Sequence, residues 1–110
     1  MTDNDAAPAG PVAVAELVAY QDGAVVSRKL VAQKGGNVTA FAFDAGQELS
    51  EHATPFDALL HVVDGRAEIR IETHTFTVAA GEQILLPANR PHAVRAGERF
   101  KMLLTMVRGG

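Results

Sequence analysis

The clearest structural signal in the sequence is the strict alternation of apolar and charged residues in Ala67-Glu68-Ile69-Arg70-Ile71-Glu72. A period of two residues is typical of a β-strand with one face buried and the other face in water. The same alternation continues in Thr75-Phe76-Thr77-Val78. The three residues between the two runs, Glu72-Thr73-His74, are therefore predicted to form the turn of a β-hairpin.

Two further segments are apolar at both odd and even positions. They are residues 37–43, NVTAFAF, and residues 100–107, FKMLLTMV. Strands of this kind need cover on both faces. We therefore expect a second sheet against one face and a second copy of the chain against the other, which predicts a homodimer.

Turn-forming residues separate the apolar segments at close and fairly even intervals. They are Asp22-Gly23, Gly35-Gly36, Gly46, Asp64-Gly65, Gly81, Pro87, Pro91 and Gly97. Glycine adopts positive φ at little cost and proline removes a ladder donor, so strands are expected to end at these positions. Closely spaced short strands with such boundaries predict an all-β sandwich or barrel in a single domain.

The N-terminal part of the chain reads differently. Residues 1–11, rich in Ala, Gly, Pro and Asp, are predicted to be a flexible tail, and residues 12–110 the barrel domain. Residues 12–19, VAVAELVA, fit either a short helix or an entry strand. Neither a secretion signal nor a membrane-spanning run is recognisable, so a cytoplasmic location is expected and a membrane partner is not.

Composition restricts the chemistry. The 110 residues carry a formal charge of −3 and only 5% aromatic residues, which argues against nucleic acid as a partner. Cysteine is absent, which excludes disulfides, thiolate ligands and cysteine nucleophiles. Any metal chemistry must therefore use the four histidines and the carboxylates.

Two separated segments carry a specific resemblance. Residues 46–65, GQELSEHATPFDALLHVVDG, resemble the first cupin motif: Gly, five residues, His-x-His, a short gap to Glu, then six residues to Gly. Residues 81–92, GEQILLPANRPH, resemble the second motif: Gly, five residues, Pro-x-Gly, two residues, His, then three residues to Asn. Asn89 replaces the Gly of Pro-x-Gly in this motif, and Ala96 replaces its final Asn. The resemblance extends from about Val25 to Val107 and implies a jelly-roll β-barrel of the RmlC-like cupin type.

The resemblance also implies a metal site, which this sequence only half retains. Cupins usually bind a divalent ion through two His and one Glu of the first motif and one His of the second. His52 and His92 occupy the first and fourth of these positions, but Thr54 and Ala58 replace the second His and the Glu. Residue type therefore excludes the full four-ligand site. The expected cofactor is one divalent ion (Fe, Mn, Zn or Ni), or none.

Asp57 is the candidate that would extend this set to three ligands. In the register that the resemblance implies, strand alternation directs the side chains of Ala58, Leu60 and Val62 into the barrel. The side chain of Asp57 then points the other way. A bulge near Pro55 would turn Asp57 inward, giving a two-His, one-carboxylate set suited to Fe(II), Mn(II) or Zn(II). In the alternative, the Asp57 carboxylate accepts hydrogen bonds from backbone amides beside the strand start.

The remaining candidates concern the barrel lining and the other two histidines. Five residues are expected to line a cavity: Thr54, Ala58, Leu60, Val62 and Met102. His61 is interpreted as a residue of the outer sheet face or of a subunit interface, and His74 as a solvated turn residue.

Three functions fit these observations. The first is a barrel that binds a small organic ligand, with an incomplete metal site formed by His52 and His92. The second is a metal-dependent oxygenase or isomerase that uses the same histidines with Asp57. The third is a non-catalytic structural or interaction dimer. One fold hosts many activities, so the sequence does not decide whether the protein is an enzyme.

Overall fold

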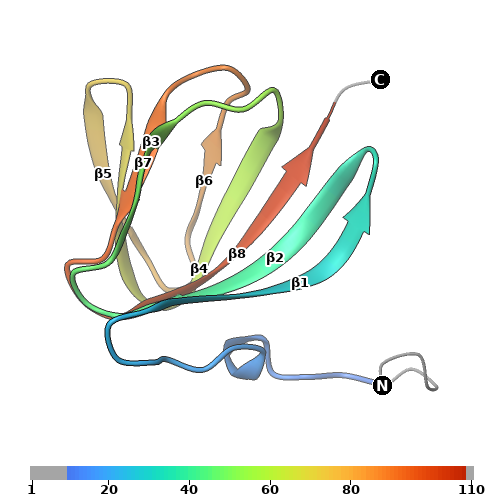
Figure 1. The fold of residues 1–110 in the computed structure, drawn as a ribbon, viewed down its shortest axis with the longest axis vertical. Helices are drawn as coiled ribbons and strands as arrows, with labels where there is room; N and C mark the ends of the chain where they lie inside the picture. Colours follow the sequence, from blue (N-terminus) through green and yellow to red (C-terminus); the bar gives the residue numbers. More distant parts are fainter. Residues whose placement is uncertain (1–9, 109–110) are drawn as a thin grey trace.

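A computed structural model describes residues 10–108 of the chain, which form eight β-strands and one short 3₁₀ turn, Val14–Glu16 (Figure 1). The strands are β1 (Val25–Gln33), β2 (Gly36–Phe43), β3 (Glu48–His52), β4 (Asp57–Ile71), β5 (His74–Ala79), β6 (Gln83–Leu86), β7 (His92–Arg95) and β8 (Phe100–Val107). The predicted strands 37–43 and 100–107 are confirmed as β2 and β8.

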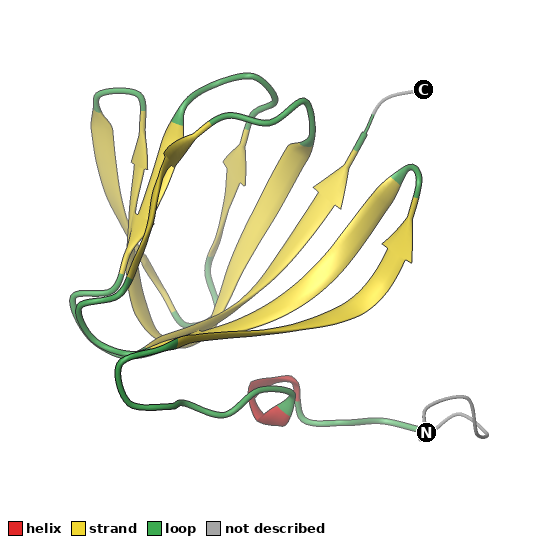
Figure 2. Ribbon diagram, viewed as in Figure 1, coloured by secondary structure: helices red, strands yellow, loops and turns green. Residues whose placement is uncertain are grey.

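The strands form one curled antiparallel sheet with two halves (Figure 2). Sheet A has the order β1-β2-β8-β4-β6, and sheet B has the order β3-β7-β4-β5. Residues 57–65 of β4 belong to sheet A and residues 66–71 to sheet B. The all-β jelly-roll barrel expected from the sequence is confirmed.

The predicted strand end at Asp64-Gly65 is wrong, because β4 continues through both residues. The register against β8 shifts between Val62 and Asp64, and Gly65 has φ 73°. This is a β-bulge, which bends the strand and increases its twist. The glycine that suggested a turn instead lets one strand pass from sheet A into sheet B.

The predicted hairpin between β4 and β5 is present with a shorter turn. His74 already pairs with Ile71, so Glu72 and Thr73 alone connect the strands, and Glu72 has φ 54°. The three-residue turn predicted from the sequence therefore included the first residue of β5.

The core lies between the two sheets. Its fully buried residues are Phe43, Ala58, Leu60, Val62, Ala67, Ile69, Val78, Leu86, Val94, Ala96, Phe100 and Met102. The rings of Phe43 and Phe100 stack with their centroids 4.5 Å apart, from neighbouring strands β2 and β8. These two rings fill one end of the barrel.

The segment before β1 packs on the outer face of sheet A, where Val18 is buried against Ala40 and Ala42. Lys101 Nζ donates to the Ala15 carbonyl at 2.5 Å, and the Tyr20 hydroxyl donates to Asp64 at 2.6 Å. Part of the outer cover expected from another subunit thus comes from the chain itself.

Except for residues 10 and 11, the predicted flexible tail lies outside the described residues. Between residues 10 and 108, no helix is long and apolar enough to cross a membrane.

Candidate functional site

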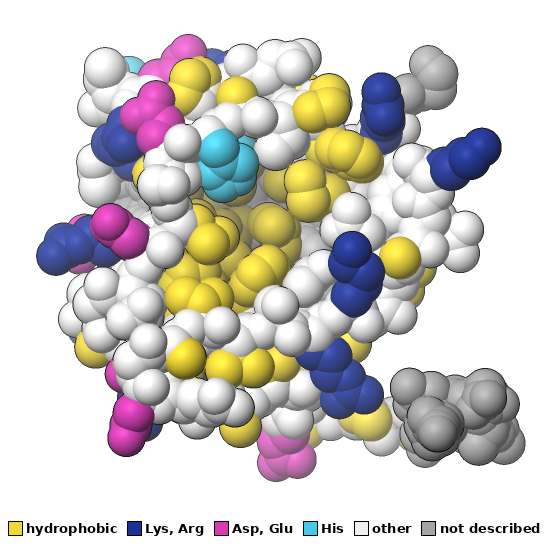
Figure 3. Space-filling view, viewed as in Figure 1, with side chains coloured by type: hydrophobic (Ala, Val, Ile, Leu, Met, Phe, Trp, Pro, Cys, Tyr) yellow, Lys and Arg dark blue, Asp and Glu magenta, His cyan; other side chains and the backbone are white. Residues whose placement is uncertain are grey.

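The barrel is packed at one end and open at the other. Along the interior face of β8, Phe100 and Met102 are buried, whereas Leu104 and Met106 are only half-buried. On β2, Phe43 is buried and Phe41 is half-buried. Figure 3 shows the result as a hollow with hydrophobic walls and a histidine at its rim. Apolar hollows with a few polar groups are the usual form of small-molecule sites.

The predicted lining residues lie deeper than expected. Ala58, Leu60, Val62 and Met102 have exposed fractions between 0% and 3% and belong to the packed core. Thr54 is partly buried, and its Oγ1 accepts the Phe56 amide at 3.1 Å. The first four of these residues thus form the packed core, and Thr54 lies nearer the surface.

The partly buried residues on the interior faces of β2 and β8 are Phe41, Leu104 and Met106, and they form the half-exposed wall. Their strands were recognised, and alternation places them on the same face as Phe43 and Met102. Sequence alone gave no signal for the level at which the barrel opens.

His52 and His92 are brought together, as the sequence predicts. They are cross-strand partners between β3 and β7, and their ring centroids are 4.5 Å apart in an edge-on arrangement. His92 lies on the same face of β7 as the core residue Val94 and is 6% exposed, whereas His52 is exposed. The pair therefore lies on the interior side of the barrel, with His52 as its solvent-facing member.

Backbone hydrogen bonds define the tautomer of both rings. His52 Nδ1 lies 2.9 Å from the Ser50 carbonyl oxygen, and His92 Nδ1 lies 3.2 Å from that of Arg90. A carbonyl only accepts, so each Nδ1 carries the proton and each neutral ring keeps a lone pair on Nε2. Burial lowers the pKa of His92; the Arg90 carbonyl opposes this effect, and the charge of His52 adds to it. Both rings are thus hydrogen-bond acceptors when neutral.

The structure does not bring Asp57 to the histidine pair. Its Oδ1 accepts the Ala88 backbone amide at 2.8 Å, which is the alternative left open by the sequence. Within residues 10–108, no three His, Cys, Asp or Glu side chains are grouped so as to hold a metal ion. The two imidazoles, with Thr54 and Ala58 in the other two motif positions, do not fit a metal held by the protein alone.

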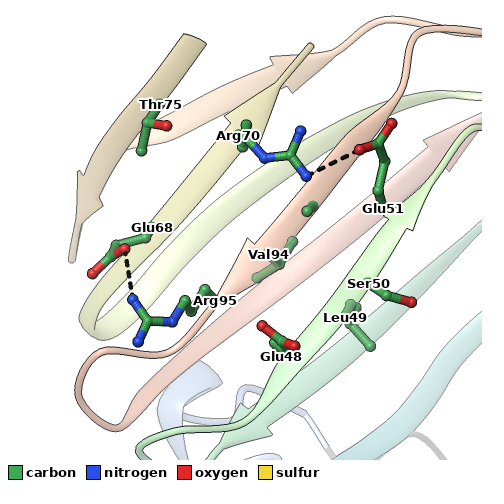
Figure 4. Close-up of a pocket in the computed structure, with 10 residues that line it drawn as sticks. Glu48, Leu49, Ser50, Glu51, Glu68, Arg70, Thr75, Val94 and Arg95 are labelled. Atoms are coloured by element: carbon green, nitrogen blue, oxygen red, sulfur yellow. Dashed lines mark hydrogen bonds and ion pairs between the residues drawn. The ribbon is translucent and has the colours of Figure 1, made fainter. Parts of the chain in front are cut away.

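The outer face of sheet B carries a second cavity, of about 300 Å³ (Figure 4). Arg70 pairs with Glu51 at 3.1 Å and Arg95 pairs with Glu68 at 3.5 Å across its surface. All four side chains are at least 40% exposed. Exposed pairs of this kind contribute little energy, and their opposite charges neutralise each other. This cavity is a solvated sheet face rather than a second ligand site.

The other histidines lie apart from the hollow. His61 points to the outer face of sheet A beside Leu59, and His74 begins β5; both are exposed. These positions agree with the outer-face and surface roles expected for them.

Comparison with known proteins identifies the family of the chain. The family model for the cupin domain matches residues 40–107. The chain belongs to the cupin family. No curated protein sequence matches this cupin.

Solved structures agree with this assignment. A conserved protein of unknown function from Streptococcus pyogenes is 37% identical, with a TM-score of 0.90, over 94% of this chain and 90% of its own. A cupin 2 conserved barrel domain protein from Leptotrichia buccalis is 44% identical, with a TM-score of 0.83 over 86% of this chain; the match spans 46% of that longer protein. A cupin superfamily protein from Desulfitobacterium hafniense, 24% identical, has the same fold, with a TM-score of 0.88.

Proposed function

We propose that this cupin binds a small, largely apolar organic molecule in the barrel hollow, and that the molecule donates a hydrogen bond to the histidine pair. The observation that carries the proposal is a hollow with hydrophobic walls and a histidine at its rim (Figure 3), together with two imidazoles whose Nδ1 atoms are bound to backbone carbonyls and whose Nε2 atoms keep a lone pair. A phenol or a similar neutral hydroxyl compound has the matching chemistry.

The energetics favour such a ligand over a purely apolar one or an anion. A hydroxyl group that leaves water without a partner is penalised by about 1–3 kcal/mol, and an imidazole acceptor removes that penalty. A carboxylate has no proton to donate to a neutral imidazole and would lose its hydration among apolar side chains. One neutral hydrogen bond contributes about 0.5–1.5 kcal/mol, which corresponds to a Kd difference of about 2- to 12-fold.

Calorimetric titration with phenol, toluene and benzoate tests the proposal. Phenol is expected to bind best, with a Kd about 2- to 12-fold below that of toluene. The variant His92→Ala should lose the preference for phenol over toluene, while the matched control His61→Ala, altered on the outer sheet face, should keep it. Equal binding of phenol and toluene by the unaltered protein would contradict the proposed role of the histidines, and binding of none of the three would contradict the proposed ligand class.

The metal-dependent oxygenase or isomerase is the second candidate, favoured by the 4.5 Å approach of the two imidazoles. A metal between them would need its remaining ligands from outside the set that cupins usually supply. Elemental analysis of protein purified without chelator distinguishes the candidates. Near-stoichiometric Fe, Mn, Zn or Ni that is lost in a His52→Ala, His92→Ala double variant would favour the enzyme. If neither metal nor probe binds, the structural role would be favoured instead.

A further inference from the structure

The concave face of sheet A carries a positive charge at its β1 edge. The row of side chains that crosses this face, in the order β1, β2, β8, β4, β6, is Lys29, Thr39, Leu104, Leu60 and Ile84. Each is the direct cross-strand partner of the next. Directly opposed residues point to the same side of a sheet. Leu60 belongs to the core and Leu104 to the half-exposed wall, so Lys29 lies on the side of the sheet that faces the hollow.

The residue before Lys29 confirms this direction. Arg28 donates a hydrogen bond to the Leu17 carbonyl at 3.3 Å, and Leu17 packs on the outer face of sheet A. Successive side chains of a strand point to opposite faces, so Lys29 points inward where Arg28 points outward. Lys29 is exposed, and every ion pair between residues 10 and 108 uses an arginine. Its charge is therefore not neutralised within the described part of the chain.

Two further polar side chains share this face near Lys29. Ser27, two residues away on β1, pairs with Phe41, and Asn37 on β2 pairs with Met106, so both adjoin the half-exposed wall. A hydroxyl, an amide and an ammonium group all donate hydrogen bonds. Strands β1, β2 and β8 contain no Asp or Glu. This edge of the hollow thus combines hydrogen-bond donors with a positive charge, which is the chemistry that receives an anion.

The histidine pair lies on the other side of the hollow. Strands β3 and β7 stand on one side, and β8, β2 and β1 on the other (Figure 1). The same view in Figure 3 shows basic side chains on the β1–β2 side and the histidine at the rim across from them. Facing sheets lie about 10 Å apart. A molecule that reaches both sides must therefore carry its hydrogen-bond donor at one end and its anionic group at the other.

We propose that the ligand of the hollow is an elongated hydroxy acid, whose carboxylate is held at the β1 edge by Lys29. This inference rests on the proposed function, in which the hydroxyl group donates to the histidine pair and the apolar body lies against the wall. It adds an acid group at the far end of that molecule. At the exposed edge the carboxylate keeps part of its hydration, so it escapes the penalty that disfavours an acid inside the hollow. A para-hydroxyphenylalkanoate is the simplest compound with this arrangement.

Calorimetric titration with para-hydroxyphenylpropionate and with its primary amide tests the charge. The two compounds have the same length and hydroxyl group, and they differ in charge at neutral pH. An ion pair at an exposed edge is worth a factor of about 1.5 to 5 in Kd, so the acid should bind more tightly than the amide by this factor. The preference should shrink in about 1 M salt, where charges are screened within about 3 Å.

Two variants assign the preference to one lysine. Lys29→Gln should bind acid and amide equally. Lys34→Gln is the matched control, because it removes the same charge from the turn of the same hairpin and should keep the preference. Circular dichroism confirms that both variants fold. Equal binding of acid and amide by the unaltered protein, or a preference that persists in Lys29→Gln, would overturn the proposal.

An isomer tests whether the ligand spans the hollow. In ortho-hydroxyphenylpropionate the hydroxyl group and the acid chain are neighbours on the ring, so the molecule cannot reach the histidine pair and Lys29 together. It should bind more weakly than the para isomer, and equal Kd values would overturn the proposed orientation. The comparison of phenol with toluene reports on the proposed function separately. If phenol is preferred but the acid is not, the role of Lys29 fails while the proposed function stands.

Discussion

Gly65 bends β4 between the two sheets, and replacing it with alanine should destabilise the barrel for two separable reasons. Its φ of 73° is a left-handed conformation that costs an L-residue about 1–2 kcal/mol. In addition, an alanine Cβ would collide with the Arg99 carbonyl oxygen and crowd the Phe100 backbone. Forcing an extra carbon into a packed site costs about 1–3 kcal/mol. The expected loss for Gly65→Ala is therefore about 2–5 kcal/mol.

Two other glycines separate the contributions. Gly46 has φ 88° with no atom within 4 Å of an added Cβ, so Gly46→Ala tests the backbone conformation alone. Gly36 is not among the positive-φ glycines, but its Cβ would collide with the Met106 carbonyl, so Gly36→Ala tests the collision alone. Gly65→Ala carries both penalties, so its loss should exceed that of either control.

Urea unfolding followed by circular dichroism measures the three losses, and a thermal melt provides a second readout. Small domains have a total stability of only about 5–15 kcal/mol, so Gly65→Ala should lower the melting temperature by more than about 10 °C. If Gly65→Ala were no less stable than Gly46→Ala, the reasoning on the collision would be refuted. If Gly46→Ala were neutral, the reasoning on backbone conformation would be refuted.

Three further predictions concern titration. The hydrogen bond from Arg99, together with the Gly23 amide, lowers the pKa of Asp44 from 3.8 to about 2. A lowered carboxyl pKa stabilises the fold above the unfolded value, so stability should fall between pH 4 and pH 2, and less so in Asp44→Asn. Burial and the Asp64 hydrogen bond raise the pKa of Tyr20, the one tyrosine of the chain, so its absorbance at alkaline pH should titrate above pH 10 and return to about 10 in urea. Burial lowers the pKa of His92, so its ring protons in NMR spectra should titrate below pH 6.5, and a value above 6.5 would contradict the buried position.

The strands were predictable where hydrophobic pattern determines them. The alternation at 67–72 predicts the sheet B half of β4, and the two-sided apolar runs at 37–43 and 100–107 predict β2 and β8. At Asp64-Gly65 the same reasoning failed. A glycine with positive φ is compatible with a turn and with a bulge, and only the pairing partners across the strand distinguish the two.

The site was predictable to the extent that motif spacing determines register. His52 and His92 come together because the two motifs place them opposite each other on β3 and β7. The orientation of Asp57 was left open because it depends on the Ala88 amide, which is 31 residues away in the sequence. The exposed wall could not be predicted, since alternation gives the face of a strand but not the depth at which the barrel is filled.

The position of β8 in sheet A has a consequence for the order of events during synthesis. β8 lies between β2 and β4, yet it follows every other strand in the chain. While the ribosome is still adding residues before Phe100, β2 lacks its second neighbour and the hollow lacks the wall that Leu104 and Met106 provide. The N-terminal segment is made first, but its Ala15 carbonyl finds Lys101 only after 86 further residues. The β1–β2 hairpin can form early, whereas sheet A closes only after β8 has left the exit tunnel. Until then the nascent chain exposes long apolar strand edges, which are surfaces that chaperones bind.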